Sequence, residues 1–151
     1  MKVALVCPYS LTLPGGVQGQ VLGLARELRS LGIDARVVGP CDGPPPETGV
    51  TSVGRSIRLA ANGSVAPIAP DPAAAARTLA ALRAEGPDIV HLHEPFVPGP
   101  CLTAVLAAKG PFVGTFHASG SAPGYTFFMP VVRFGSRRLS ARVAVSERAR
   151  A

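Results

Sequence analysis

The sequence has few cysteines and no long hydrophobic run, and these absences exclude several classes of protein. The three cysteines, Cys7, Cys41 and Cys101, are far apart and lack metal-type spacing, so they predict neither a disulfide framework nor a zinc site. The apolar run that starts at Val3 ends before Pro8, which is too short for a signal sequence or a membrane span. We therefore expect a cytoplasmic protein, with any membrane contact peripheral and confined to the inner face of the plasma membrane.

Aromatic and acidic residues are also scarce. The 151 residues include no tryptophan and only 5% aromatic residues, and 15 lysines and arginines outnumber nine acidic residues, which gives a net charge of +6. A basic chain can bind nucleic acid, but the arginines here are spread over several segments without interleaved aromatic residues, so a nucleic-acid partner is disfavoured. The arginines between Arg133 and Arg150 are typical of a solvated surface, with contact to an anionic membrane as the alternative.

Strands and helices are predicted to alternate along the chain. Residues 3–7 form a continuous apolar run, typical of a parallel strand buried on both faces, and residues 17–31 have the apolar spacing of an amphipathic helix. Gly32 is expected to end this helix, and Asp71 followed by Pro72 is typical of a helix start. Further strands are expected at 35–39, 50–53, 57–59, 88–91, 112–116 and 142–145, and further helices at 72–85, 102–109 and 127–139.

This alternation predicts one α/β domain over residues 1–151, with a Rossmann-like, mostly parallel sheet and helices on both faces. Ligands of such sheets bind at the carboxyl ends of the strands, which points to the loops after Cys7, His91 and Phe116. Ser146 is typical of a helix start and lies only a few residues before the last residue, so we expect the native protein to continue.

Gly15 and Gly16 lie between the first predicted strand and the first predicted helix. Glycine lets a ligand approach the backbone closely, and the free amides at a helix start favour a phosphate group. The alternative is a tight turn that requires positive φ. No G-x-G-x-x-G motif follows the first strand, so the sequence disfavours a nicotinamide-dependent dehydrogenase.

Histidines occur where two of the predicted strands end. His91 and His93 alternate along one strand, so their side chains should share one side of the sheet. A third metal ligand at a useful spacing is not evident, and we therefore expect no metal site. His117 directly follows the strand at 112–116, where a side chain either contacts a ligand in the crevice or serves only the structure.

Six segments follow the order and spacing of a known family. They are Val6-Cys7-Pro8-Tyr9-Ser10, Pro14-Gly15-Gly16-Val17-Gln18, Asn62-Gly63-Ser64-Val65-Ala66, His91-Leu92-His93-Glu94-Pro95, Thr115-Phe116-His117 and Val143-Ala144-Val145-Ser146. Together they resemble the amino-terminal domains of the phosphatidylinositol mannosyltransferases, which are retaining GT-B glycosyltransferases of family 4. The resemblance covers the whole chain and implies the amino-terminal, acceptor-side domain of a GT-B fold.

The resemblance also implies roles for single residues. Gly15 and Gly16 would contact the diphosphate of the donor, and His117 would act as the catalytic residue by contacting the transferred sugar. The acceptor would lie against the side chains of Tyr9, Gln18, Asn62 and Ser64. Positioning and preorganised electrostatics would then carry most of the catalysis.

By the same resemblance, the donor would be GDP-mannose or another nucleotide diphosphate sugar, and neither a cofactor nor a metal ion would be needed. The acceptor would be a phosphatidylinositol-type lipid or another molecule with a hydroxyl group. The carboxyl-terminal, donor-binding domain of such an enzyme is absent from this chain, so we expect the chain alone to be inactive. A non-catalytic, nucleotide- or ligand-binding α/β module is the alternative.

Overall fold

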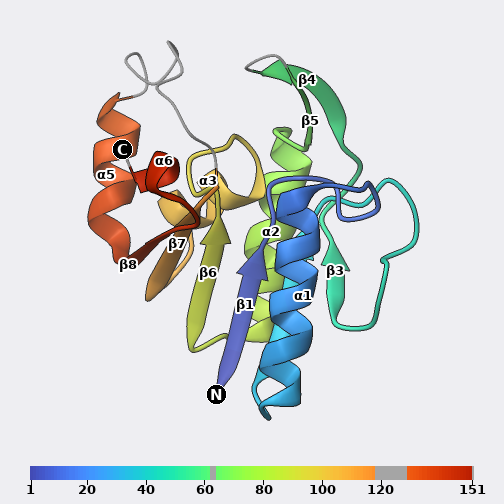
Figure 1. Cartoon of the computed structure of the whole chain (residues 1–151). Helices are drawn as coiled ribbons and strands as arrows, with labels where there is room; N and C mark the ends of the chain where they lie inside the picture. Colours follow the sequence, from blue (N-terminus) through green and yellow to red (C-terminus); the bar gives the residue numbers. More distant parts are fainter. Residues whose placement is uncertain (62–63, 118–128, 151) are drawn as a thin grey trace.

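The computed structural model describes residues 1–61, 64–117 and 129–150, in which a parallel sheet is flanked by helices (Figure 1). The strands of this sheet are β1 (Lys2–Val6), β2 (Asp34–Gly39), β3 (Val50–Ser52), β6 (Ile89–His93), β7 (Phe112–Phe116) and β8 (Leu139–Ala144). Their order is β3-β2-β1-β6-β7-β8, and every neighbouring pair is parallel. The helices are α1 (Gly16–Ser30), α2 (Pro72–Glu85), α3 (Pro100–Ala107), α5 (Met129–Arg138) and α6 (Glu147–Arg150). None of the described helices is long and apolar enough to cross a membrane.

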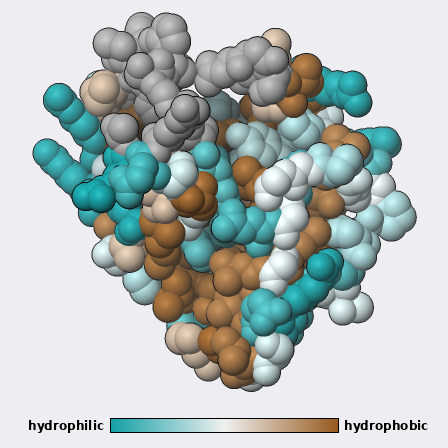
Figure 2. Space-filling view, in the orientation of Figure 1, coloured by the Kyte–Doolittle hydropathy of each residue, from teal (hydrophilic) through white to brown (hydrophobic). Residues whose placement is uncertain are grey.

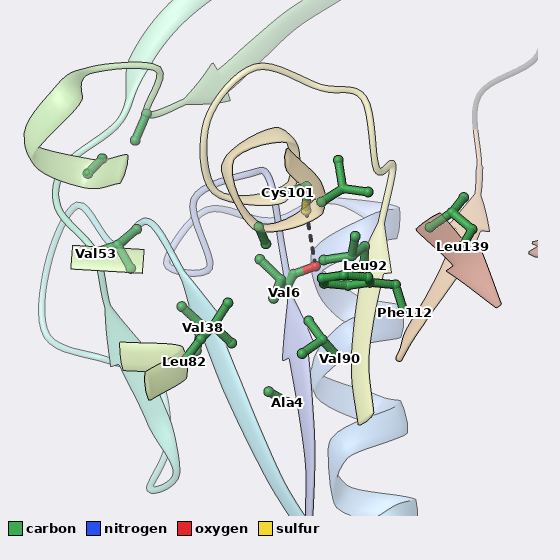
Figure 3. Close-up of a cluster of buried hydrophobic side chains, with 14 residues drawn as sticks. Ala4, Val6, Val38, Val53, Leu82, Val90, Leu92, Cys101, Phe112 and Leu139 are labelled. Atoms are coloured by element: carbon green, nitrogen blue, oxygen red, sulfur yellow. Dashed lines mark hydrogen bonds between the residues drawn. The ribbon is translucent and has the colours of Figure 1, made fainter. Parts of the chain in front are cut away.

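The side chains of β1 point alternately into two hydrophobic clusters, one on each face of the sheet. Val3 and Leu5 belong to the cluster formed with α1. Ala4 and Val6 belong to the cluster formed with α2 and α3, in which Phe112 is the largest buried side chain (Figure 3). Helices thus cover both faces of the sheet, which confirms the predicted α/β class and explains why the first strand is apolar throughout.

Local signals determine where two of the helices begin and end. Asp71 Oδ1 accepts a hydrogen bond from Ala74 N at 2.9 Å and Pro72 takes the first helical position, so α2 begins as predicted. This helix ends at Gly86, whose φ of 55° is left-handed. Gly32, with a φ of 80°, follows α1 in the same way.

An antiparallel hairpin of β4 (Ile57–Ala61) and β5 (Ser64–Ile68) stands outside the main sheet, beyond the carboxyl ends of the central strands (Figure 1). The sequence predicts part of β4 and misses β5, because a proline such as Pro67 is unusual inside a strand. The hairpin is tied to the loop after β1, since Ser10 N donates to Pro67 O at 2.9 Å. The loop and the hairpin together shape the site described below.

Several element boundaries differ from the predicted ones, and those of α3, α5 and β8 have a physical explanation. Helix α3 begins at Pro100, two residues earlier than expected, because proline suits the first position of a helix. The helix predicted at 127–139 is α5, which ends at Arg138, so Leu139 opens β8 instead of closing the helix. Leu139 is buried beside Phe112 in the cluster on the α2–α3 face, and this tertiary packing outweighs local helix propensity.

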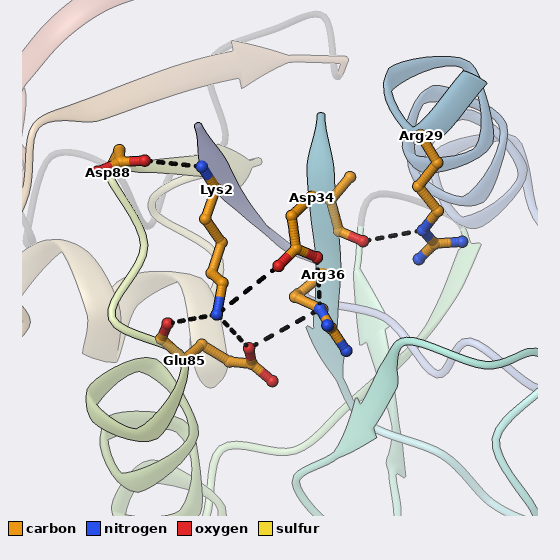
Figure 4. Close-up of polar contacts among 7 residues, drawn as sticks. Lys2, Arg29, Asp34, Arg36, Glu85 and Asp88 are labelled. Atoms are coloured by element: carbon orange, nitrogen blue, oxygen red, sulfur yellow. Dashed lines mark hydrogen bonds and ion pairs between the residues drawn. The ribbon is translucent and has the colours of Figure 1, made fainter. Parts of the chain in front are cut away.

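Charged side chains gather at the opposite end of the sheet from the hairpin (Figure 4). Lys2 Nζ lies 3.4 Å from Glu85 Oε2 and 3.7 Å from Asp34 Oδ2, and Arg36 Nε lies 2.7 Å from Asp34 Oδ1. Exposed pairs of this kind contribute about 0–1 kcal/mol each. These charges therefore pair with one another at this end of the sheet.

Candidate functional site

A cleft lies between the start of α1 and the β4–β5 hairpin, near the carboxyl end of β1, and its volume is about 620 Å³. The predicted site residues Tyr9, Gly15, Gly16 and Gln18 lie together in its wall. The hairpin supplies the facing wall, which includes Arg58. The structure therefore brings the predicted donor-binding glycines and two of the predicted acceptor-binding residues into one site.

The two glycines have different local surroundings. Gly15 precedes α1 with an extended φ of 179°, and neither Gly15 nor Gly16 has positive φ, so the tight-turn alternative is wrong. A Cβ at Gly15 would collide with the side-chain amide of Gln18, whereas a Cβ at Gly16 would meet nothing within 4 Å. Gly15 thus makes room for Gln18, and Gly16 leaves open space at the first turn of α1, where helix amides lack intrahelical partners.

Backbone contacts fix the loop that carries Tyr9. Tyr9 forms an isolated antiparallel bridge with Ile68 at the end of β5. Gln18 is buried, and its Nε2 donates to Ser10 O at 3.4 Å, a long hydrogen bond. The loop after β1, the first turn of α1 and the hairpin are therefore joined around the cleft.

Two predicted acceptor residues are less fully placed. Asn62 lies outside the described residues. Ser64 begins β5, where it pairs with Ala61 across the hairpin. Sequence reasoning missed Arg58, which pairs with Pro67 in the hairpin and lines the cleft with it. In the sequence Arg58 stands directly between two apolar residues. This alternation is a weak strand signal, and it does not indicate a binding residue unless the hairpin is known.

Three imidazole rings form a row along β6 and the end of β7. His91 and His93 stack with ring centroids 4.5 Å apart, which confirms that they share one side of the sheet, and His93 stacks on His117 at 5.2 Å. His93 Nδ1 lies 3.0 Å from His117 Nε2, and His91 Nε2 lies 2.7 Å from Thr115 Oγ1. Val90 and Leu92 point into the cluster on the α2–α3 face, so the histidine row lies on the other face, which α1 covers over β1 and β2 (Figure 1). The view from this side shows apolar surface toward the lower centre (Figure 2).

Glu94 links the end of β6 to His117. It is buried and takes a left-handed φ of 53°, which is strained for a residue with a side chain. Its backbone N–H donates to Thr115 O at 2.8 Å, and its Oε1 accepts a hydrogen bond from His117 N at 2.5 Å. The carboxylate therefore holds the backbone at the point where β7 ends and His117 begins.

The buried environment keeps the histidine row neutral. Burial, together with the neighbouring imidazoles, lowers the pKa of His93 to about 3 and that of His91 to about 4. Burial also lowers the pKa of His117, against the opposing effect of the Glu94 charge. A neutral imidazole has one N–H donor and one acceptor nitrogen, so it can orient a polar ligand without adding charge.

The cleft and the histidine row lie at the same end of the sheet. Gly16 opens the helix that follows β1, and His117 directly follows β7, two strands away. The residues that line the cleft come from the β1–α1 loop, α1 and the hairpin, and the histidines are not among those described in its wall. No group of three His, Cys, Asp or Glu residues within the described ranges could hold a metal ion.

Two solved structures superpose on most of this chain. MurG from Acinetobacter baumannii superposes with a TM-score of 0.59 at 14% identity, over 98% of this chain and 42% of that one. The UDP-GlcNAc 2-epimerase from Methanocaldococcus jannaschii superposes with a TM-score of 0.57 at 15% identity, over 99% of this chain and 40% of that one. At such low identity these likenesses support the Rossmann-like GT-B fold alone.

Sequence relatives are more informative. The chain is 40% identical to the phosphatidyl-myo-inositol mannosyltransferase of Mycobacterium leprae and 37% identical to that of Propionibacterium freudenreichii subsp. shermanii. Each match covers 99% of this chain but only 41% and 42% of the respective relative, so the chain spans less than half of their length. The model of the family described as Glycosyltransferase Family 4 matches residues 14–151. Because that match takes in most of the chain, this protein belongs to glycosyltransferase family 4.

Proposed function

We propose that this chain is the acceptor-side, amino-terminal half of a retaining glycosyltransferase. It would help to move a hexose, with mannose as the first candidate, from GDP-mannose or another nucleotide diphosphate sugar to an inositol phospholipid or another hydroxyl acceptor. A carboxyl-terminal half would hold most of the donor. The enzyme would work in the cytoplasm, in peripheral contact with the anionic inner face of the plasma membrane.

The observation that carries this proposal is the open start of α1. Gly16 is the first residue of this 15-residue helix and lines the cleft. Outside its chain neighbours and its own helix turn, no described atom lies within 4 Å of where a Cβ would stand. No acidic residue lies in the first turn, so the positive end of the helix dipole is not offset there. A donor diphosphate could approach the first amides of α1 directly.

The second part of the proposal concerns His117. A half-buried, neutral imidazole at the end of β7 suits a contact with a sugar hydroxyl. It can donate one hydrogen bond to the hydroxyl, and because it carries no charge it does not attract the diphosphate in place of the sugar. Such a contact would hold the transferred sugar against the acceptor, and its contribution would be one of positioning.

The acceptor would occupy the side of the cleft formed by Tyr9, Gln18 and the hairpin. Arg58 is exposed on this wall and makes no ion pair with any residue that the structure describes. A guanidinium group binds phosphate well, so Arg58 would favour an acceptor that carries a phosphate group. This chemistry supports a phospholipid acceptor.

Gly16→Val tests the proposed diphosphate contact. The valine side chain would enter the space that the donor needs, and its Cβ would meet no atom outside its chain neighbours and its own helix turn, so the fold should be preserved. We expect the affinity of the full-length enzyme for GDP-mannose, measured by calorimetric titration, to fall at least tenfold, which corresponds to about 1.4 kcal/mol. Donor binding without sugar transfer in the unmodified enzyme would instead favour the non-catalytic module.

Gly19→Val is the matched control for this experiment. Gly19 lies on the same helix, also has open space at its Cβ position, and is not part of the cleft wall. Both substitutions replace a glycine of the first turns of α1 with the same residue, but only Gly16→Val should weaken donor binding. Equal affinities in the two variants would rule out the contact at Gly16.

Arg58→Ala tests the charge of the acceptor. We expect the KM for an inositol phospholipid to rise about tenfold, equivalent to about 1.4 kcal/mol, because a charge-assisted hydrogen bond to phosphate is lost. The KM for free inositol, which has no phosphate, should stay unchanged. Arg55→Ala, which removes an exposed arginine outside the cleft wall, should alter neither value. A parallel rise for both acceptors would contradict the proposed phosphate contact.

A further inference from the structure

The histidine row contains a hydrogen bond whose direction can be worked out. His93 Nδ1 and His117 Nε2 are 3.0 Å apart, so one hydrogen atom lies between them. Both rings are neutral at physiological pH, since burial lowers the pKa of each. A neutral imidazole carries a single N–H, so only two arrangements of protons satisfy this contact.

The other nitrogen of His93 distinguishes the two arrangements. His93 is 1% exposed, and its Nε2 has no hydrogen-bond partner among the residues that the structure describes. If His117 donated the hydrogen bond, His93 would carry its own hydrogen on Nε2, which would leave a buried N–H unpaired. If His93 donates from Nδ1, its Nε2 is a bare lone pair, and proteins tolerate an unpaired acceptor better than an unpaired N–H.

The arrangement in which His93 donates the hydrogen bond also determines the tautomer of His117. Its Nε2 then accepts the hydrogen bond from His93, so its one hydrogen must sit on Nδ1. The backbone of His117 is fixed independently, because its N–H donates to the buried carboxylate of Glu94. The Glu94 contact thus fixes the backbone from which the imidazole projects, and the contact with His93 orients the ring.

We propose that His93 is a positioning residue that holds His117 in the Nδ1–H tautomer, so that the ring offers a hydrogen-bond donor at Nδ1. The link to sugar transfer rests on the proposed function, in which His117 contacts the transferred sugar. A hydroxyl oxygen of the transferred sugar would accept from this N–H. His91, the third member of the row, forms a hydrogen bond with Thr115 and packs against His93. It does not determine which nitrogen of His93 carries the hydrogen.

The tautomers can be read directly in the ¹⁵N-labelled 151-residue chain. Its three histidines give a simple two-bond ¹H–¹⁵N spectrum of the imidazole nitrogens. We expect both His93 and His117 to carry hydrogen on Nδ1 at pH 7.5, with pyridine-type shifts for both Nε2 atoms. An Nε2–H signal for His117 in the unmodified chain would overturn the proposal, and this measurement requires no substitution.

Substitutions test whether His93 is the cause. In His93→Leu, His117 should shift toward the Nε2–H tautomer that free neutral histidine prefers in water, and its pKa should rise because its acceptor nitrogen is no longer occupied. His93→Asn places an amide N–H where Nδ1 stood and should restore the Nδ1–H tautomer. His91→Gln is the control and should leave the tautomer of His117 unchanged. An unchanged tautomer in His93→Leu would show that His93 has only a structural role.

Sugar transfer by the full-length enzyme separates this inference from the proposed function. We expect His93→Leu to lower kcat by about tenfold to a hundredfold, the range seen when outer partners of metal-bound histidines are lost, and His93→Asn to recover part of it. The KM for the nucleotide sugar should change little. If the spectra agree with the expectation but the enzyme transfers no sugar to any acceptor, the proposed function fails and the tautomer assignment stands.

Discussion

Replacing His117 with alanine is expected to lower the turnover of the full-length enzyme by about 10²-fold or more, which corresponds to about 2.7 kcal/mol of transition-state stabilisation. The reason is the loss of a neutral hydrogen-bonding group at the end of β7, next to the proposed path of the transferred sugar. Single-turnover rates with GDP-mannose and an inositol phospholipid would measure the effect. The KM for the donor should change much less than kcat.

The fold should survive this substitution, because His117 is only partly buried and its backbone hydrogen bond to Glu94 does not depend on the imidazole. Arg36→Ala is a suitable control, since it removes a charged side chain at the opposite end of the sheet and should leave turnover unchanged. Turnover within twofold of the unmodified enzyme would reduce His117 to a structural residue.

Phe112→Ala is expected to destabilise the chain by about 3–5 kcal/mol, a large part of the roughly 5–15 kcal/mol that holds a typical domain together. Phe112 is 2% exposed in the cluster on the α2–α3 face, and the guanidinium of Arg138 lies 5.1 Å from its ring centroid. Alanine would leave a cavity and remove this cation–π contact. Urea unfolding followed by circular dichroism would give the change in the free energy of unfolding.

Phe134→Ala provides the matched control for Phe112→Ala. Phe134 lies on α5 and is 53% exposed, so its removal should change the free energy of unfolding by less than about 0.5 kcal/mol. A loss below about 1 kcal/mol for Phe112→Ala would mean that the sheet repacks around the missing ring, and that the α2–α3 face is less tightly packed than its burial indicates.

The fold was predictable where the signal is local. The apolar run of β1, the helical spacing of α1 and the pairing of Asp71 with Pro72 each depend on neighbouring residues, and each prediction is confirmed. The end of α5 was not predicted correctly, because Leu139 packs against residues distant in the sequence and lies outside the helix. The β5 strand was missed for the same kind of reason, since Pro67 is tolerated only because the hairpin stands outside the main sheet.

In the candidate site, too, the features with a local signal were predicted and those that depend on distant residues were not. The glycine pair and His117 were identified from their positions after predicted strands, whereas the contact between His93 and His117 depends on β6 and β7 being neighbours in a particular register. The register places His93 opposite Thr115, two residues before His117. Arg58 was missed because its proximity to the glycines arises only when the hairpin folds against the loop after β1. Sequence periodicity carries no information about either pairing.

The central position of β1 has a consequence for how the chain folds as it is made. One neighbour of β1, β2, follows within about one helix, but the other is β6, and the hydrogen bond from Lys2 N to Asp88 at its start spans 86 residues. At about 5–20 residues per second, a ribosome would deliver β6 roughly 4–17 s after β1. During that interval one edge of β1 is unpaired, and its Ala4 and Val6 face lacks α2 and α3. We therefore expect the nascent β1–α1–β2 unit to be the stage at which this protein depends most on chaperones.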